Sequence, residues 1–366
     1  MKESAMIECI SEEGIIIREI LDNKDNYTKE IVNHFKKHKV KRIYISGHGS
    51  PYNVGHVLKF AIEDLLNIEV SVDYSSLFNN YLEFNVNGVY KPDEMLLICP
   101  AQSGRTKGPV LAAQKARKAG IPVICTTLLQ DGILAKTCDI IIKKKSGVEE
   151  SFPETKGHIA SLTILLVAVI QCAFELDKID EKEYQKYIEN FYLLSDNIEK
   201  IIHFTETWYE INKKELIIAK DLTFVGYGEN YPTAVEGSLK ILETTLKACM
   251  SYECEEYMHG QNQPVDQNSY IFMIANRGKE FNRIHQLADW CRLKGAHVVL
   301  ITDEEDELKS KDDILVPSME YGHLSTISYL IPFQVLGYYI ARDMGLSSII
   351  ANHDDAGKEL GVRYED

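Results

Sequence analysis

The sequence contains no CxxC pair, although it has eight cysteines in 366 residues. Structural zinc sites commonly use cysteines in such closely spaced pairs. Most of the cysteines instead lie inside apolar runs such as LLICP and PVICTT. We therefore interpret them as small buried hydrophobic residues in a reducing cytoplasm, and expect neither a metal site nor a disulfide. They are Cys9, Cys99, Cys125, Cys138, Cys172, Cys249, Cys254 and Cys291.

The chain also lacks an excess of basic residues. Its 40 lysines and arginines stand against 55 aspartates and glutamates, which gives a net charge of −15. A nucleic-acid partner is not expected, because neutralising the phosphate backbone requires a basic surface. A small phosphorylated molecule remains possible as a ligand, since backbone amides and a few cations hold phosphate even in an acidic protein.

Long apolar runs are absent as well. The N-terminal stretch MKESAMIECISEE has no apolar signal core. The most apolar run, residues 159–174, is interrupted by Ser161, Thr163 and Gln171 and is shorter than the roughly 20 residues of a bilayer-spanning helix. We expect a buried helix there, no membrane partner, and a cytoplasmic location.

Strands and helices alternate along the chain in two similar halves. In the first half, a strand at 41–46 runs into a glycine loop, and a strand at 95–100 runs into a polar turn. Strands at 222–225 and 270–275 repeat this order in the second half. Further strands are expected at 69–73, 122–126, 139–142 and 298–302, and helices at 27–39, 52–67, 107–118, 157–176, 280–293 and 325–343. Residues 180–220 are expected to form one or two long helices with charge throughout, for example at 181–197.

This alternation predicts an α/β fold with a doubly wound, five-stranded parallel sheet in each half. We place the two domains at residues 1–198 and 199–366. In such sheets the ligand crevice lies at the carboxyl ends of the strands, so the glycine loop and the polar turn are candidate binding segments.

The segment 224–266 holds a strand, a glycine turn, a helix and a second strand that is predicted to deliver His259. The helix carries two stripes at helical spacing. We expect the apolar stripe to face the core; it comprises Val235, Leu239, Leu242 and Leu246. The charged stripe is either an exposed salt-bridge ladder or a catalytic face in which a lysine tunes a carboxylate base; it comprises Glu236, Lys240, Glu243 and Lys247.

The polar turn at 101–106 opens a helix with hydroxyl groups and backbone N–H groups. A helix N-terminus of this kind binds anions, but Ser103 or Thr106 can equally serve as an N-cap. The matching turn of the second half, residues 276–279, lacks a Ser-Gly-x-Thr pattern. Any phosphate is therefore expected in the first half.

Several of these segments together resemble the sugar isomerase (SIS) phosphosugar-binding family. The resemblance is to the isomerase domain of glucosamine-6-phosphate synthase and to the fructosamine-6-phosphate deglycases. It rests on Gly226-x-Gly228, Tyr231-Pro232, Glu236-Gly237-x-x-Lys240-x-x-Glu243 and His259-Gly260. It implies two tandem flavodoxin-like SIS domains, a catalytic pair of Glu243 and His259 assisted by Lys240, and a homodimer whose subunits share the active site.

The resemblance also suggests where the substrate binds. Residues matching the family's substrate and phosphate contacts are Gly49, Ser50, Gln102, Ser103, Gly104, Thr106 and Glu236. Lys358 resembles a tail lysine that closes over the sugar. The chain departs from the pattern at Ala101 and Pro51, where the synthases have serine, and Arg105 or Lys107 can compensate.

The implied function is that of an enzyme acting on C1 and C2 of a 6-phospho sugar, without a cofactor. The chain begins Met1-Lys2 rather than with the cysteine of a glutaminase, so we expect no glutamine-dependent synthesis. A deglycase that splits a fructosamine 6-phosphate is favoured. A glucosamine or ketose phosphate isomerase or deaminase, and a non-catalytic sugar-phosphate sensor, are the alternatives. The acidic loop with Glu149, Glu150 and Glu154 either meets a substrate amine or is solvated.

Overall fold

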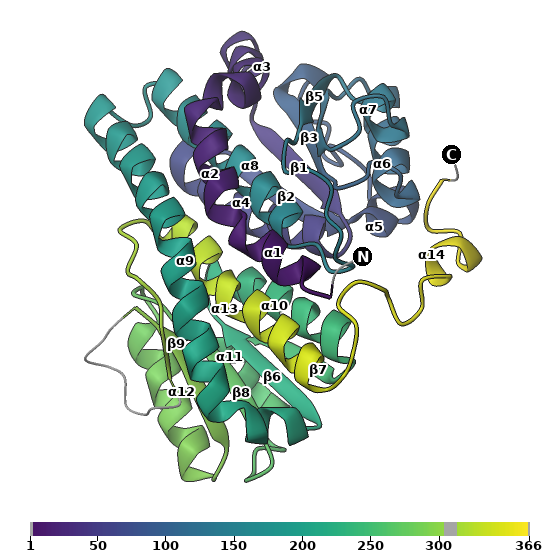
Figure 1. The fold of residues 1–366 in the computed structure, drawn as a ribbon. Helices are drawn as coiled ribbons and strands as arrows, with labels where there is room; N and C mark the ends of the chain where they lie inside the picture. Colours follow the sequence, from purple (N-terminus) through teal and green to yellow (C-terminus); the bar gives the residue numbers. More distant parts are fainter. Residues whose placement is uncertain (1–2, 304–312, 365–366) are drawn as a thin grey trace. The chain divides into compact units, whose positions relative to one another are not determined.

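The computed structural model describes residues 3–303 and 313–364. The chain forms two compact units, each with its own parallel sheet (Figure 1). The amino-terminal unit takes residues 15–149, 156–189 and 352–366, and the carboxyl-terminal unit takes residues 1–14, 150–155 and 190–351, as far as these are described. Each unit is thus built from segments that are not consecutive in the sequence. The domain boundary between residues 198 and 199 stays a prediction.

The sheet of the amino-terminal unit has the order β2-β1-β3-β4-β5, and all of its pairings are parallel. The strand order reverses between β1 and β3, so the ligand crevice is expected at the carboxyl ends of these two strands. The strands are β1 (Arg42–Gly47), β2 (Glu69–Tyr74), β3 (Met95–Pro100), β4 (Val123–Thr127) and β5 (Ile140–Lys143).

The carboxyl-terminal unit repeats this topology with the order β10-β9-β8-β6-β7, again with parallel pairings. Here β6 and β8 take the places that β1 and β3 have in the first sheet. Two doubly wound five-stranded sheets are therefore confirmed. The strands are β6 (Asp221–Gly226), β7 (Ala248–Glu253), β8 (Tyr270–Ala275), β9 (His297–Thr302) and β10 (Ile314–Leu315).

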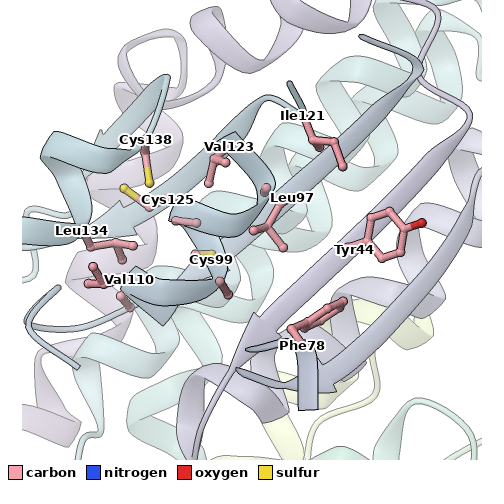
Figure 2. Close-up of a cluster of buried hydrophobic side chains, with 14 of the residues drawn as sticks. Tyr44, Phe78, Leu97, Cys99, Val110, Ile121, Val123, Cys125, Leu134 and Cys138 are labelled. Atoms are coloured by element: carbon pink, nitrogen blue, oxygen red, sulfur yellow. The ribbon is translucent and has the colours of Figure 1, made fainter. Parts of the chain in front are cut away.

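Helices cover both faces of the first sheet. Because strand side chains alternate between faces, Leu97 and Cys99 point to one side, where they join a buried cluster with α5, α6 and α7 (Figure 2). Helices α4 and α8 pack together, and α3 packs on α8. These helices are α3 (Lys24–Lys37), α4 (Ser50–Leu66), α5 (Ser75–Asn80), α6 (Lys107–Lys118), α7 (Ile133–Thr137) and α8 (Lys156–Glu175).

In the carboxyl-terminal unit, α10 packs along α13, and α12 packs on β8 and β9. Two further segments are short: η1 (Pro92–Glu94) precedes β3, and η2 (Tyr257–Gln261) follows α11. The remaining helices are α1 (Ala5–Ser11), α2 (Glu13–Asp22), α9 (Glu181–Ile218), α10 (Asn230–Thr245), α11 (Cys254–Glu256), α12 (Phe281–Leu293), α13 (Gly322–Asp343) and α14 (Ala356–Glu359).

Two helices, α8 and α13, are long and apolar enough to cross a membrane by length and composition alone. In each, 89% of the apolar window is buried inside the structure, as in the core helices of soluble proteins. The buried helix expected at residues 159–174 is thus confirmed. All eight cysteines are free, and all but the half-buried Cys249 are buried, as their apolar surroundings predicted.

Three of the sequence predictions are wrong in detail. Residues 5–22, where no helix was expected, form α1 and α2, because Met6, Ile10 and Ile17 give these short segments an apolar face that is fully buried. His259 does not end a strand: β7 stops at Glu253, and the chain turns through α11 into η2, which contains the histidine.

The third error concerns the apolar stripe of α10. Leu242 is 41% exposed and Leu246 is 51% exposed, whereas the buried face carries small residues such as Ala234 and Gly237. A Cβ atom on Gly237 would lie 2.2 Å from the ring of Phe333 in α13. The close approach of α13 therefore selects the face of α10 that has small side chains, not the face with leucines.

Candidate functional sites

The charged stripe of α10 is buried rather than exposed. The Lys240 ammonium lies 3.3 Å from a carboxylate oxygen of Glu236 and 2.8 Å from one of Glu243. The side chains of Glu236 and Lys240 are each 1% exposed, and that of Glu243 is 22% exposed. A solvated salt-bridge ladder is thus excluded for these three residues. Lys247 leaves the stripe and donates to the carbonyls of Ile217 and Ala219 instead.

Burial and charge act against each other in this cluster. Desolvation raises the pKa of the Glu243 carboxyl above its ordinary value, the Lys240 ammonium lowers it, and the charges of Glu236 and Glu154 raise it again. Burial alone would lower the pKa of Lys240, but Glu236 and Glu243 outweigh it, so that pKa is raised. Lys240 therefore stays charged beside a carboxylate whose basicity is enhanced.

The three glutamates of the acidic loop have different surroundings. The Glu149 carboxylate accepts hydrogen bonds from the backbone N–H groups of Lys156 and Gly157, each at 3.2 Å, and so caps the start of α8. Glu154 acts electrostatically on Lys240 and Glu243. The exposed Glu150 fits the solvated alternative. One loop residue thus adds a third carboxylate to the charged cluster.

His259 lies exposed in η2, at a sharp kink where Gly260 adopts a φ of 122°. Its Nδ1 lies 2.7 Å from the carbonyl oxygen of Glu255. Because a carbonyl oxygen only accepts, Nδ1 carries a proton in this contact, and Nε2 takes no part in it. Within the described part of the chain, no hydrogen bond or ion pair joins His259 to Glu243.

The polar turn lies in the amino-terminal unit, at the carboxyl end of β3. Gly104 has a φ of 66°, and a Cβ atom there would lie 2.9 Å from the Thr127 hydroxyl, so only glycine fits. Thr106 holds the N-cap position of α6 without making a side-chain capping bond. The Ser103 hydroxyl accepts from the Arg105 N–H at 3.3 Å. The Thr106 hydroxyl is therefore not consumed by a cap, which favours the anion-binding interpretation.

The glycine loop after β1 has a similar design. Gly49 takes the N-cap position of α4 with a φ of 59°, and Ser50 is buried in the first turn of that helix. His48 stacks on Tyr74, with ring centroids 5.9 Å apart, and burial lowers its pKa. Its Nε2 lies 2.8 Å from where Gly108 of α6 would carry a Cβ atom, so the loop after β1 approaches the start of α6.

The C-terminal tail makes contacts with the polar turn that the sequence did not reveal. The Lys107 N–H donates to the Val362 carbonyl and the Tyr364 N–H donates to the Arg105 carbonyl, each at 3.0 Å. Thr106 and Arg363 form an antiparallel bridge. Lys358, predicted to close over the sugar, lies exposed in the short helix α14 just before this bridge. A backbone pairing of this kind leaves no periodic signal in the side chains.

The sequence and structure comparisons agree with this architecture. The SIS domain family matches residues 38–171 and 215–336, one segment for each sheet. The chain belongs to the SIS domain family.

Similar proteins extend over most of the chain. A glutamine–fructose-6-phosphate aminotransferase (isomerizing) of Clostridium tetani is 25% identical over 349 residues, which are 93% of this chain and 56% of that protein. The corresponding aminotransferase of Buchnera aphidicola is 29% identical over 84% of this chain and 49% of its own length. The chain thus spans about half the length of these curated relatives.

Solved structures show the same fold. The C-terminal domain of glucosamine-fructose-6-phosphate aminotransferase from Francisella tularensis has a TM-score of 0.85 and 22% identity, covering 94% of this chain and 97% of that one. The glucosamine-6-phosphate deaminase of Thermotoga maritima has a TM-score of 0.71 and 20% identity, covering 96% and 98%. The two-sheet arrangement is therefore common to enzymes named for different reactions.

The burial of the charged cluster generates a stability prediction. Lys240→Met should lower the free energy of unfolding by about 3–5 kcal/mol at neutral pH, because it leaves the buried Glu236 and Glu243 carboxylates without their cation. Without Lys240, the folded-state pKa values of these carboxyls rise above their unfolded values. The loss should then be full above the raised pKa values and shrink as the pH falls through them. Urea unfolding at neutral and acidic pH measures this.

Lys213→Met is the matched control, since Lys213 pairs with Glu210 on the surface at 2.6 Å. Its effect should stay within about 1 kcal/mol. Equal unfolding midpoints for the two variants would contradict the buried ion cluster.

Proposed function

We propose that this chain is a phosphosugar enzyme that transfers a proton between C1 and C2 of a 6-phospho sugar, with Glu243 as the base. The observation that carries the proposal is the partly buried Glu243 carboxylate beside the buried Lys240 ammonium, 2.8 Å away. A catalytic base needs a pKa brought toward the working pH, and burial raises that of Glu243 while Lys240 limits the rise. The matched region is only about half of each aminotransferase, so their names support the enzyme class of this chain by analogy alone.

We further propose a deglycase reaction on a fructosamine 6-phosphate. His259 takes the proton of the C2 hydroxyl and delivers a proton to the ring oxygen, so that the bond between C2 and the ring oxygen breaks and the C2 ketone forms. Glu243 then takes a proton from C1, which carries the nitrogen, while water protonates the C2 oxygen, and an enaminol forms. Return of the proton to C2 gives an imine at C1. Addition of water and cleavage of the C1–N bond release the amine and glucose 6-phosphate.

The preference for an amine-bearing substrate comes from the charges around Lys240. Three carboxylates, those of Glu236, Glu243 and Glu154, act on this one ammonium. These carboxylates attract a nearby positive charge, so a substrate that brings its own ammonium group is favoured over a ketose phosphate without one. The names of the relatives instead favour isomerase or deaminase chemistry, which the same Glu243 and His259 can perform, and this is the second candidate function.

The phosphate is proposed to bind at the polar turn, with the Ser103 and Thr106 hydroxyls, the Gln102 amide and the N–H groups around Gly104 as donors. Gly49 and Ser50 of the neighbouring glycine loop are proposed to line the same crevice. Lys358 is proposed to contact the sugar, since it precedes a tail that is hydrogen-bonded to the turn. No cofactor enters this scheme.

A homodimer with a shared active site is proposed as the working form. The exposed His259 needs surroundings in which its proton transfer is shielded from water. Leu242 and Leu246 form an exposed apolar stripe on α10, and Met250 of β7, a strand that α10 contacts, is exposed as well. A second copy of the chain that covers this stripe would bury the leucines one turn beyond the Glu243 cluster.

The catalytic proposal predicts that Glu243→Gln lowers kcat by about 10²–10⁴-fold, because the amide keeps the shape but cannot accept the proton. His259→Asn should lower kcat similarly on the cyclic substrate and less on an open-chain analogue. The assay mixes pure protein with a fructosamine 6-phosphate and follows glucose 6-phosphate. Wild-type turnover by Glu243→Gln would reject Glu243 as base. A wild type that binds sugar phosphates tightly but converts none would instead be a sensor.

The amine preference predicts a selective effect of Glu154→Gln. The KM for fructosamine 6-phosphate should rise about tenfold to a hundredfold, as expected for loss of a contact between opposite charges. The Kd for fructose 6-phosphate, which has no ammonium group, should stay unchanged. Glu150→Gln is the matched control because Glu150 is exposed in the same loop. An equal loss for both ligands would show that Glu154 does not recognise the amine.

The dimer proposal predicts that wild-type protein sediments as a dimer at micromolar concentration. Leu242→Glu with Leu246→Glu should give a monomer with reduced turnover, since charges would face the partner's apolar stripe. Leu293→Glu, at an 85% exposed position on α12, should leave both properties unchanged. A wild-type monomer with full activity would end the shared-site proposal.

A further inference from the structure

Lys144 is a buried lysine that the proposed reaction does not use. It directly follows β5 and is 1% exposed, whereas its neighbours Lys143 and Lys145 are exposed. Its ammonium donates to the Gln102 side-chain oxygen, to the Ser161 hydroxyl at 2.8 Å and to the Gly157 carbonyl at 3.2 Å. These three acceptors match the three N–H donors of a lysine.

The contact with Lys144 fixes the orientation of the Gln102 amide. An ammonium group has no lone pair, so the atom of Gln102 that faces it must be the amide oxygen, Oε1. The amide nitrogen, Nε2, then keeps its two N–H groups for other acceptors. A Gln102 without this contact would have to be ordered when the anion binds, at a cost in side-chain entropy.

The start of α8 holds the same amide from another side. A Cβ atom on Gly157 would lie 2.2 Å from the Gln102 nitrogen and 2.7 Å from its oxygen, so the amide packs directly on the glycine. Glu149 in turn holds the N–H of Gly157 at 3.2 Å. The carbonyl of Gln102 accepts from the Leu128 N–H at 3.0 Å. Gln102 is thus fixed at both its backbone and its side chain.

The charge of Lys144 also acts on the turn. A buried cation is poorly screened, and here it lies directly behind the first polar residue of an anion-binding turn in a chain of net charge −15. A fixed amide and a buried positive charge both favour an anion at the turn.

We propose that Lys144 is a positioning residue for the phosphate of the substrate: it orients the Gln102 amide so that its N–H groups face the phosphate. This inference rests on the proposed phosphate site at residues 102–106. Lys144 should therefore affect the affinity for the substrate and not the rate of proton transfer.

The test compares full-length wild type with Lys144→Met, which is one atom shorter and has no hydrogen-bond donor. The Kd for inorganic phosphate, measured by calorimetry, and the KM for the sugar phosphate should each rise about tenfold or more, with kcat within about twofold. Lys145→Met is the control and should bind like wild type. A loss confined to kcat, or no change in Kd, would overturn the proposal.

A double-mutant cycle separates positioning from the direct effect of charge. If Lys144 acts through Gln102, adding Lys144→Met to Gln102→Ala should weaken phosphate binding little further. Fully additive losses would overturn the positioning role. If Lys144→Met fails to fold, Gly157→Ala gives the second measurement: it displaces the Gln102 amide, keeps Lys144, and should weaken phosphate binding as well. Wild-type affinity in Gly157→Ala would likewise reject the proposal.

Failure of this inference can be told apart from failure of the proposed function. Loss of phosphate binding in Ser103→Ala with Thr106→Val, but not in Lys144→Met, would leave the phosphate site in place and remove only the role of Lys144. A wild type that binds no phosphate at the turn would overturn both.

Discussion

The contact of Lys240 with Glu236 and Glu243 is the constraint around which the carboxyl-terminal unit is built. A buried ion cluster costs desolvation energy, which is recovered only when the geometry is fixed. Close packing of α10 and α13 supplies that geometry. A Cβ atom on Gly237 would meet the Phe333 ring, and one on Gly337 would lie 3.1 Å from the Thr244 hydroxyl and 3.3 Å from the Lys240 carbonyl. Gly237 and Gly337 therefore allow α10 and α13 to approach closely, and this packing fixes the helix that carries the buried ion cluster.

The same constraint explains which part of the site the sequence could not predict. Helical spacing correctly placed Glu236, Lys240 and Glu243 on one face, but it placed the leucine face toward the core. Hydrophobic periodicity predicts that the most apolar face of a helix is buried. The close approach of α13 instead buries the face of α10 that has the smallest side chains. Leu242 and Leu246 could be recognised as exposed only once the partner helix was known. Periodicity alone could not tell whether the charged face of α10 is solvated, and the burial of Glu236 and Lys240 shows that it is not.

Elements defined by local sequence were predictable, and contacts between distant segments were not. Strand–turn–helix order gave both sheets and located Gln102, Ser103 and Gly104 at the end of β3. The contacts that fix this turn come from far along the chain: Lys144, Gly157 of α8 and the tail bridge at Arg363. A run of three lysines is typical of a solvated segment, so the local sequence does not predict that Lys144 is buried. The burial of Lys144 becomes apparent only in the folded structure.

The two sheets share one topology, but the turns that follow β3 and β8 make different contacts. In the amino-terminal unit, the turn after β3 presents the Thr106 hydroxyl without a capping bond. In the carboxyl-terminal unit, the matching turn after β8 is covered by the buried Tyr227, whose hydroxyl donates to the Asn276 carbonyl. A Cβ atom on Gly278 would lie 3.3 Å from the Tyr227 ring. An aromatic ring thus lies directly against the turn of the second unit, which supports the proposal that the anion site belongs to the amino-terminal unit.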